Sequence, residues 1–167
     1  MMTPTHDRLL RSIRLWLTVF IAGLVLSGLT AFPLVHELAL LVRVNAALHL
    51  NEHLPALNNW IVEVHDALAV NSVRYPFLAY GTDWLAFGHL VIATAFIGAW
   101  RDPLRNRWLI TWGLIACAAV IPFAFSFGPA RGIPVYWSLI DCSFGVFGCI
   151  PLLIIRRRIH QLDALNP

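Results

Sequence analysis

The sequence has few charged residues and no lysine. Of its 167 residues, 13% are charged and 59% are hydrophobic, whereas a soluble domain usually carries about 25% charged residues. All twelve basic residues are arginine, and the formal net charge of +3 is too small and too scattered to suggest binding to nucleic acid. We therefore expect the apolar excess to face a lipid bilayer, and we expect no nucleic-acid partner.

Cysteine is also scarce. The three cysteines, Cys117, Cys142 and Cys149, lie in hydrophobic runs and form no CxxC motif. This pattern favours neither a disulfide framework nor a thiol redox pair, so we interpret the cysteines as small packing residues. No internal repeat or low-complexity linker divides the chain, which predicts a single membrane domain over residues 1–167.

Long apolar runs are abundant by contrast, and they cover residues 15–34, 84–100, 108–127 and 137–155. Crossing about 30 Å of hydrocarbon takes roughly 20 helical residues, and three of the runs begin with a tryptophan suited to the membrane interface. The first run is longer than the apolar region of a signal peptide and lacks an A-x-A-like cleavage site, which favours an uncleaved anchor. The sequence thus predicts an all-α integral membrane protein, a bundle of four transmembrane helices.

The arginines predict the orientation of this bundle. Nine of the twelve lie in the amino-terminal segment, in the connection between the second and third runs, and in the carboxyl-terminal tail. The other three, Arg43, Arg74 and Arg131, lie in the alternate connections. Since basic loops stay on the cytoplasmic side, we expect a multi-pass protein of a bacterial inner membrane with both termini in the cytoplasm. Asp102 and Pro103 are interpreted as the N-cap and first residue of the third helix.

The segment over residues 35–83 is too long for a simple loop. It holds five of the nine acidic residues and four of the seven histidines. Its second half predicts an amphipathic helix, with one apolar stripe formed by Leu57, Trp60, Ile61, Val64 and Leu68. We expect this segment on the outer face, between the first and second transmembrane helices, lying on the bundle or in the headgroup layer.

The stretch HLNEH in this outer segment resembles the H-x-x-E-H motif of the inverzincins. The resemblance implies that His49 and His53 hold zinc while Glu52 serves as general base. No third ligand is singled out by spacing. Pro55 disfavours helical geometry at Leu54, which places His53 in a last helical turn. The alternative interpretation is that these imidazoles stabilise a helix carboxyl end.

Two ionisable residues lie inside the apolar runs. His89 follows the start of the second run by five residues, and Asp141 follows the start of the fourth by four, so both lie at a similar depth below the outer boundary. A stripe of small and polar residues on the fourth run should turn Asp141 toward the bundle; its members are Ser138, Asp141, Cys142, Gly145, Gly148 and Cys149. We expect a polar pocket between the second and fourth helices, lined by Asp83, His89, Arg131 and Asp141.

Several functions fit such a pocket. An Asp–His pair can have a purely structural role and hold two helices together. The favoured interpretation of the protein is a non-enzymatic binding or accessory subunit, without a cofactor, that acts in a membrane complex or a homo-oligomer. One alternative is a small membrane oxidoreductase that binds haem or quinone through His89, with His36 as a second haem ligand. Another is a zinc-dependent hydrolase that uses His49, Glu52 and His53.

Overall fold

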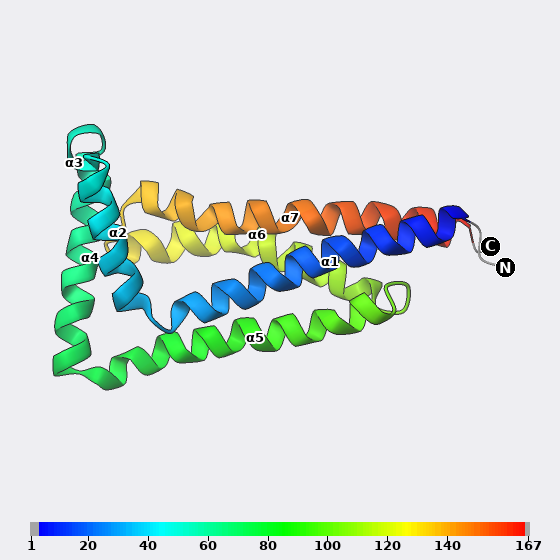
Figure 1. The fold of residues 1–167 in the computed structure, drawn as a ribbon, viewed down its shortest axis with the longest axis horizontal. Helices are drawn as coiled ribbons and strands as arrows, with labels where there is room; N and C mark the ends of the chain where they lie inside the picture. The colour runs from blue at the N-terminus through cyan, green and yellow to red at the C-terminus, as the bar shows by residue number, and fades with distance from the viewer. Residues whose placement is uncertain (1–3, 166–167) are drawn as a thin grey trace. The chain divides into compact units, whose positions relative to one another are not determined.

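The computed structural model describes residues 4–165, and over that range it consists of helices and turns with no β-strand (Figure 1). The α-helices are α1 (Pro4–Ala31), α2 (Leu34–Ala47), α3 (Leu50–His53), α4 (Pro55–Arg74), α5 (Tyr80–Arg101), α6 (Arg107–Ala130) and α7 (Val135–Asp163), and the 3-10 helix η1 (Pro76–Ala79) precedes α5. The prediction of an all-α protein is confirmed.

Four of these helices are long and apolar enough to span a membrane: α1, α5, α6 and α7. One of them, α6, has 24 residues and is therefore about 36 Å long, more than the roughly 30 Å of a hydrocarbon core. In the most apolar part of each helix only 17–33% of the residues are buried. Most of their apolar side chains therefore lie on the outside of the protein.

The helices extend beyond the apolar runs that predict them. α1 begins at Pro4 instead of residue 15, and α7 continues to Asp163 instead of ending at residue 155. The added turns are rich in arginine, which is a good helix former, so the polar ends continue the helices outside the apolar run. At its other end α1 stops at Ala31 because the Phe32–Pro33 step disfavours helical geometry.

The start of the third long helix was predicted wrongly. Asp102 does accept a hydrogen bond from the backbone N–H of Arg105 (3.0 Å), as an N-cap residue would. The turn that it caps is not continued, and α6 begins at Arg107 with Asn106 as its N-cap residue. Asn106 instead closes the end of α5, since its Nδ2 donates to the carbonyl oxygen of Gly98 (3.0 Å).

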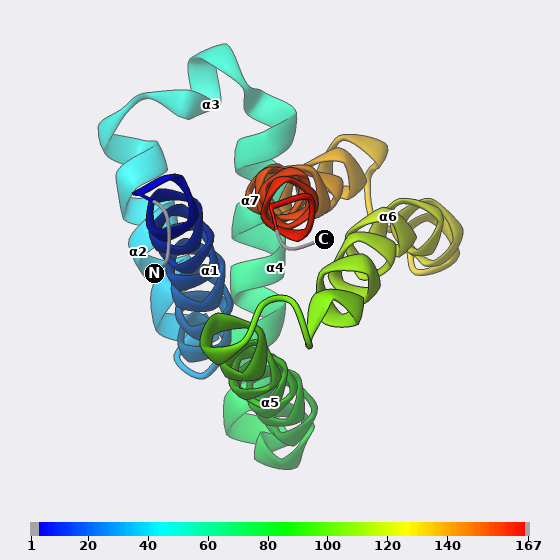
Figure 2. The same ribbon diagram turned by 90° about the vertical axis from the view of Figure 1, so that its right-hand side faces the viewer.

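Over residues 4–165 the chain forms two compact units. The first comprises residues 4–23 and 92–165, and the second comprises residues 24–91. In the first unit α6 and α7 lie side by side (Figures 1 and 2). Its largest fully buried side chains are apolar: Ile13, Leu17, Phe96, Ile110, Leu152, Ile155 and Leu162.

Three segments lie at one end of the first unit: the beginning of α1, the α5–α6 connection and the end of α7 (Figure 1). The Arg14 guanidinium lies 5.2 Å from the centre of the Trp100 ring, and Trp100 Nε1 donates to Thr18 Oγ1 (3.2 Å). Arg107 and Asp163 form an ion pair at 3.3 Å. The three arginine-rich segments of the sequence therefore meet at one end of this unit.

The second unit contains the segment that was predicted to be an outer helical layer. α2 and α4 pack against each other, and α3 connects them. The predicted stripe of α4 is confirmed, because its five apolar residues are buried or half-buried while Asn59, Glu63 and Asp66 on the other side are exposed. Tyr75 and Phe77 remain 40% and 70% exposed around η1.

Candidate functional site

The small-residue stripe of α7 is turned toward another helix of the first unit, as the sequence predicts, and that helix is α6. Ser138 and Cys142 are 1% and 8% exposed and Gly145 is buried. Bulky residues on the opposite side of α7 are exposed instead, with Phe144 at 67% and Phe147 at 68%. Small side chains allow the backbones of two helices to approach closely, which is how helices associate in lipid.

Glycines determine how closely α6 and α7 approach. A Cβ atom added at Gly145 would lie 2.5 Å from the carbonyl oxygen of Cys117, and one added at Gly128 would lie 2.5 Å from Ser138 Oγ. The first of these contacts is with backbone, which cannot rotate away. Any larger residue at position 145 must therefore separate the two helices.

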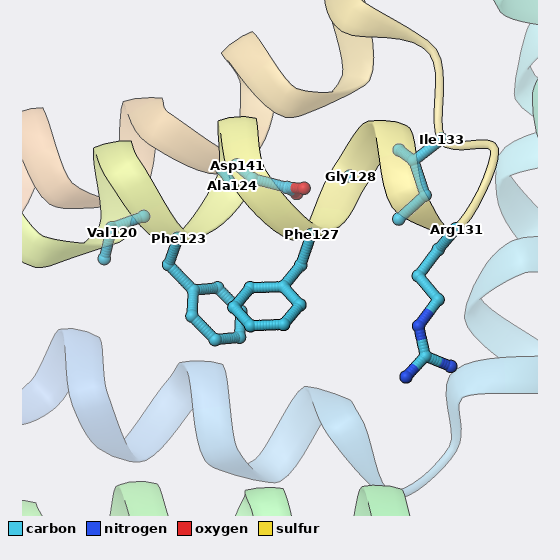
Figure 3. Close-up of a pocket in the computed structure, with 8 residues that line it drawn as sticks. All are labelled: Val120, Phe123, Ala124, Phe127, Gly128, Arg131, Ile133 and Asp141. Atoms are coloured by element: carbon cyan, nitrogen blue, oxygen red, sulfur yellow. The ribbon is translucent and has the colours of Figure 1, made fainter.

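A pocket of about 420 Å³ lies beside this contact, toward the end of α6 (Figure 3). It is lined by Val120, Phe123, Ala124, Phe127, Gly128, Arg131, Ile133 and Asp141. The rings of Phe123 and Phe127 lie against each other, with centres 4.6 Å apart. The pocket is thus an apolar hollow with one carboxylate and one guanidinium.

The two charged groups of this pocket do not form an ion pair in the part of the chain that the structure describes. In Figure 3 the Arg131 side chain extends from the α6–α7 connection away from Asp141, whose carboxylate lies over α6. Ser138 Oγ is buried next to Gly128, and no hydrogen-bond partner for it is found among residues 4–165. An occupant with an apolar body and a hydrogen-bond donor or positive charge would suit Asp141.

The other two residues of the predicted pocket, Asp83 and His89, belong to the second unit. A pocket lined by these two residues together with Arg131 and Asp141 stays a prediction. His89 Nδ1 lies 2.8 Å from the carbonyl oxygen of Leu85, and because a carbonyl only accepts, this nitrogen carries the proton. A neutral His89 then keeps Nε2 free of hydrogen, the form in which imidazole accepts hydrogen bonds or binds metals.

The backbone of α1 lies close to His89. A Cβ atom added at Gly28 of α1 would lie 3.0 Å from the carbonyl oxygen of Ala86 and 3.1 Å from His89 Cβ. α1 therefore packs directly on this part of α5. Asp83 lies in the first turn of α5, where a negative charge stabilises the helix dipole.

The HLNEH stretch does not form one continuous helix. α2 ends at Ala47, and His49 adopts a left-handed conformation with φ of 52°. His53 is the last residue of the four-residue helix α3, in agreement with the expected effect of Pro55. The common helical face that the resemblance to inverzincins implies is therefore absent here. Within residues 4–165 no group of three or more His, Cys, Asp or Glu side chains is placed to hold a metal ion.

One contact between two cysteines was missed in the sequence. The Cys117 thiol of α6 interacts with the Cys149 thiol of α7, although the two are far apart in the chain. The sequence did contain a sign of this contact, because both cysteines lie at a similar distance along their helices from the arginines at one end of the unit. Cys117 lies ten residues after Arg107, and Cys149 lies seven residues before Arg156.

Comparisons with protein-family models, curated protein sequences and solved structures gave no match.

Proposed function

We propose that this chain is a multi-pass protein of a cell inner membrane that serves as a non-enzymatic binding or accessory subunit. The observation that carries the proposal is the exposed apolar surface of the four long helices. Leu15, Ile115 and Phe147, for example, are 63%, 63% and 68% exposed. Each large apolar side chain left in water forgoes roughly 1.5–3 kcal/mol of burial free energy, whereas lipid accepts such a surface.

The arrangement of the arginines supports an orientation with both termini in the cytoplasm. Nine of the twelve lie on segments that meet at one end of the first unit. Arg131 is at the other end of α6, in the α6–α7 connection. Basic segments resist transfer across the membrane, so the end that carries nine arginines is the cytoplasmic one in this proposal.

The pocket beside α6 and α7 supports a binding role. Its volume of about 420 Å³ falls within the roughly 300–1,000 Å³ of typical small-molecule sites. The outer helices support a partner surface, because Leu40, Leu48 and Val73 are 61%, 61% and 85% exposed on α2 and α4 and the segment between them. Either a membrane protein or the headgroup layer can cover these side chains.

Membrane topology is tested with a matched pair of labelling sites. In a variant whose three cysteines are replaced by serine, a cysteine is introduced at Glu63 of α4 or at Gln161 of α7, both of which are exposed. A maleimide that cannot cross membranes should label position 63 in intact cells and position 161 only after permeabilisation. Labelling of position 161 in intact cells would overturn the orientation, and recovery of the protein in the soluble fraction would overturn insertion.

The binding role is tested by native mass spectrometry of protein purified in mild detergent. The wild type should retain a bound small molecule or a partner chain, and Asp141→Leu should lose the small molecule. Phe144→Leu is the matched control, because Phe144 lies on the exposed side of α7. Equal retention by both variants would show that the pocket beside Asp141 is not the binding site.

A second candidate function is haem binding through His89. The observation that favours it is the hydrogen bond to Leu85, since it orients the ring and leaves Nε2 available for iron. His36, the proposed second ligand, lies on α2 and is exposed. A Soret band and stoichiometric iron in the purified protein, both lost in His89→Ala, would establish this function instead of the first.

A further inference from the structure

Two cysteine side chains from different helices meet inside the α6–α7 contact. A Cβ atom added at Gly148 would lie 3.0 Å from Cys117 Sγ, which places this sulfur directly against the residue that precedes Cys149. The two thiols interact with each other. Both are half-buried, whereas the third cysteine, Cys142, is 8% exposed. The pair is therefore more accessible from outside the helices than Cys142.

The backbones of α6 and α7 approach each other closely beside this pair. Bridged cysteines have Cβ atoms about 3.5–4.5 Å apart, a separation that two helices reach only where their contact residues are small. Gly145 and Gly148 provide this condition on α7, and Gly145 lies against the carbonyl group of Cys117 itself. A disulfide between Cys117 and Cys149 thus joins two segments that are already in contact.

The depth of the pair decides which oxidants can reach it. At about 1.5 Å per residue, the two cysteines lie roughly 10–15 Å from Arg107 and Arg156, which is close to the middle of a hydrocarbon core of about 30 Å. Water-soluble disulfides such as oxidised glutathione do not enter that region. Quinones do, because their ring and chain dissolve in lipid.

We infer that Cys117 and Cys149 form a redox-active dithiol that a membrane quinone oxidises reversibly to a disulfide. Two S–H bonds break and one S–S bond forms, and both electrons and both protons pass to the quinone, which becomes a quinol. The inference rests on the proposed membrane insertion but not on the pocket or its ligand. Its chemical consequence is a covalent lock between α6 and α7 under oxidising conditions.

The experiment counts free thiols in the full-length protein in its membrane. Membranes are treated with a ubiquinone analogue whose ring is fully substituted, so that it cannot add to thiols. The protein is then denatured in the presence of a maleimide-linked polyethylene glycol, which adds to each free thiol. The wild type should carry three adducts before oxidation and one afterwards, on Cys142, and reductant should restore three. Three adducts after quinone treatment would refute the inference.

Single substitutions identify the pair. Cys142→Ser should fall from two adducts to none, whereas Cys117→Ser and Cys149→Ser should keep two adducts with or without quinone. Disulfide-linked dimers in place of an internally bridged monomer would also overturn the inference, as would a loss of thiols that reductant does not reverse. A negative result here leaves the topology and pocket experiments unaffected, so the two proposals fail separately.

Discussion

Replacement of Gly145 by alanine should weaken the α6–α7 contact. The added Cβ atom would lie 2.5 Å from the carbonyl oxygen of Cys117, whereas ordinary contact begins at 3.4 Å. The helices must therefore move apart by roughly 0.9 Å, and a gap of about 0.5–1 Å forfeits a quarter to a half of the dispersion energy of each contact. Overpacking of this kind typically costs about 1–3 kcal/mol of the free energy of unfolding.

Gly88→Ala is the matched control. It is the same substitution in another long apolar helix, and within the described residues nothing lies within 4 Å of the added Cβ atom. Alanine is a better helix former than glycine, so this variant should gain about 0.5–1 kcal/mol. The same helical gain is present in Gly145→Ala, and the difference between the two variants isolates the cost of separating α6 from α7.

Both variants are compared with the wild type in one detergent. Unfolding by increasing SDS, followed by tryptophan fluorescence and circular dichroism, gives the free energy of unfolding. Gly145→Ala should unfold at a lower SDS fraction than the wild type, and Gly88→Ala at the same or a higher fraction. Equal stability of Gly145→Ala and Gly88→Ala would show that Gly145 does not lie this close to the carbonyl oxygen of Cys117.

Substitutions at three further positions test single hydrogen-bonding groups by the same assay. Ser138→Ala should be neutral or stabilising by up to about 1 kcal/mol, because it removes a buried hydroxyl for which residues 4–165 offer no partner; a loss of stability would reveal a partner. Asn106→Ala should lose about 1–2 kcal/mol, since its amide closes the α5 carboxyl end at Gly98, and Asn106→Gln should recover part of this. Trp100→Phe should lose about 0.5–1.5 kcal/mol with the bond to Thr18, and an unchanged stability would contradict that bond.

Sequence patterns predicted the helices well but not their ends. The apolar runs gave all four membrane-length helices, and the period of about 3.6 residues gave the buried side of α4 and the small-residue side of α7. The prediction that the third helix starts at Asp102 and Pro103 was wrong, because these two residues can cap a single turn as well as the beginning of a long helix. Whether the chain continues such a turn into a long helix depends on tertiary packing, which local chemistry does not reveal.

The candidate site was predictable in part. Asp141 and Arg131 line one pocket, but its other lining residues belong to α6 and the α6–α7 connection. The expected pocket between the second and fourth membrane helices, with Asp83 and His89, stays a prediction. The aromatic wall formed by Phe123 and Phe127 was not predicted, because apolar residues within an apolar run give no local signal for a pocket. The thiol pair was missed for a different reason. A search for CxxC motifs finds cysteines close in sequence, whereas Cys117 and Cys149 are brought together by the antiparallel packing of two helices.

The glycines of α6 and α7 explain why a pocket and a thiol pair lie along one helix contact. In the proposed membrane setting there is no gain from removing apolar surface from water between helices, so close packing of small residues must hold them together. The close approach at Gly145 that provides this packing also brings Cys117 against α7. Toward the end of α6, where the larger Phe123 and Phe127 line the pocket, the same two helices leave a hollow beside Asp141. A substitution that separates the helices should therefore impair disulfide formation and ligand retention together, whereas Cys149→Ser should remove only the first.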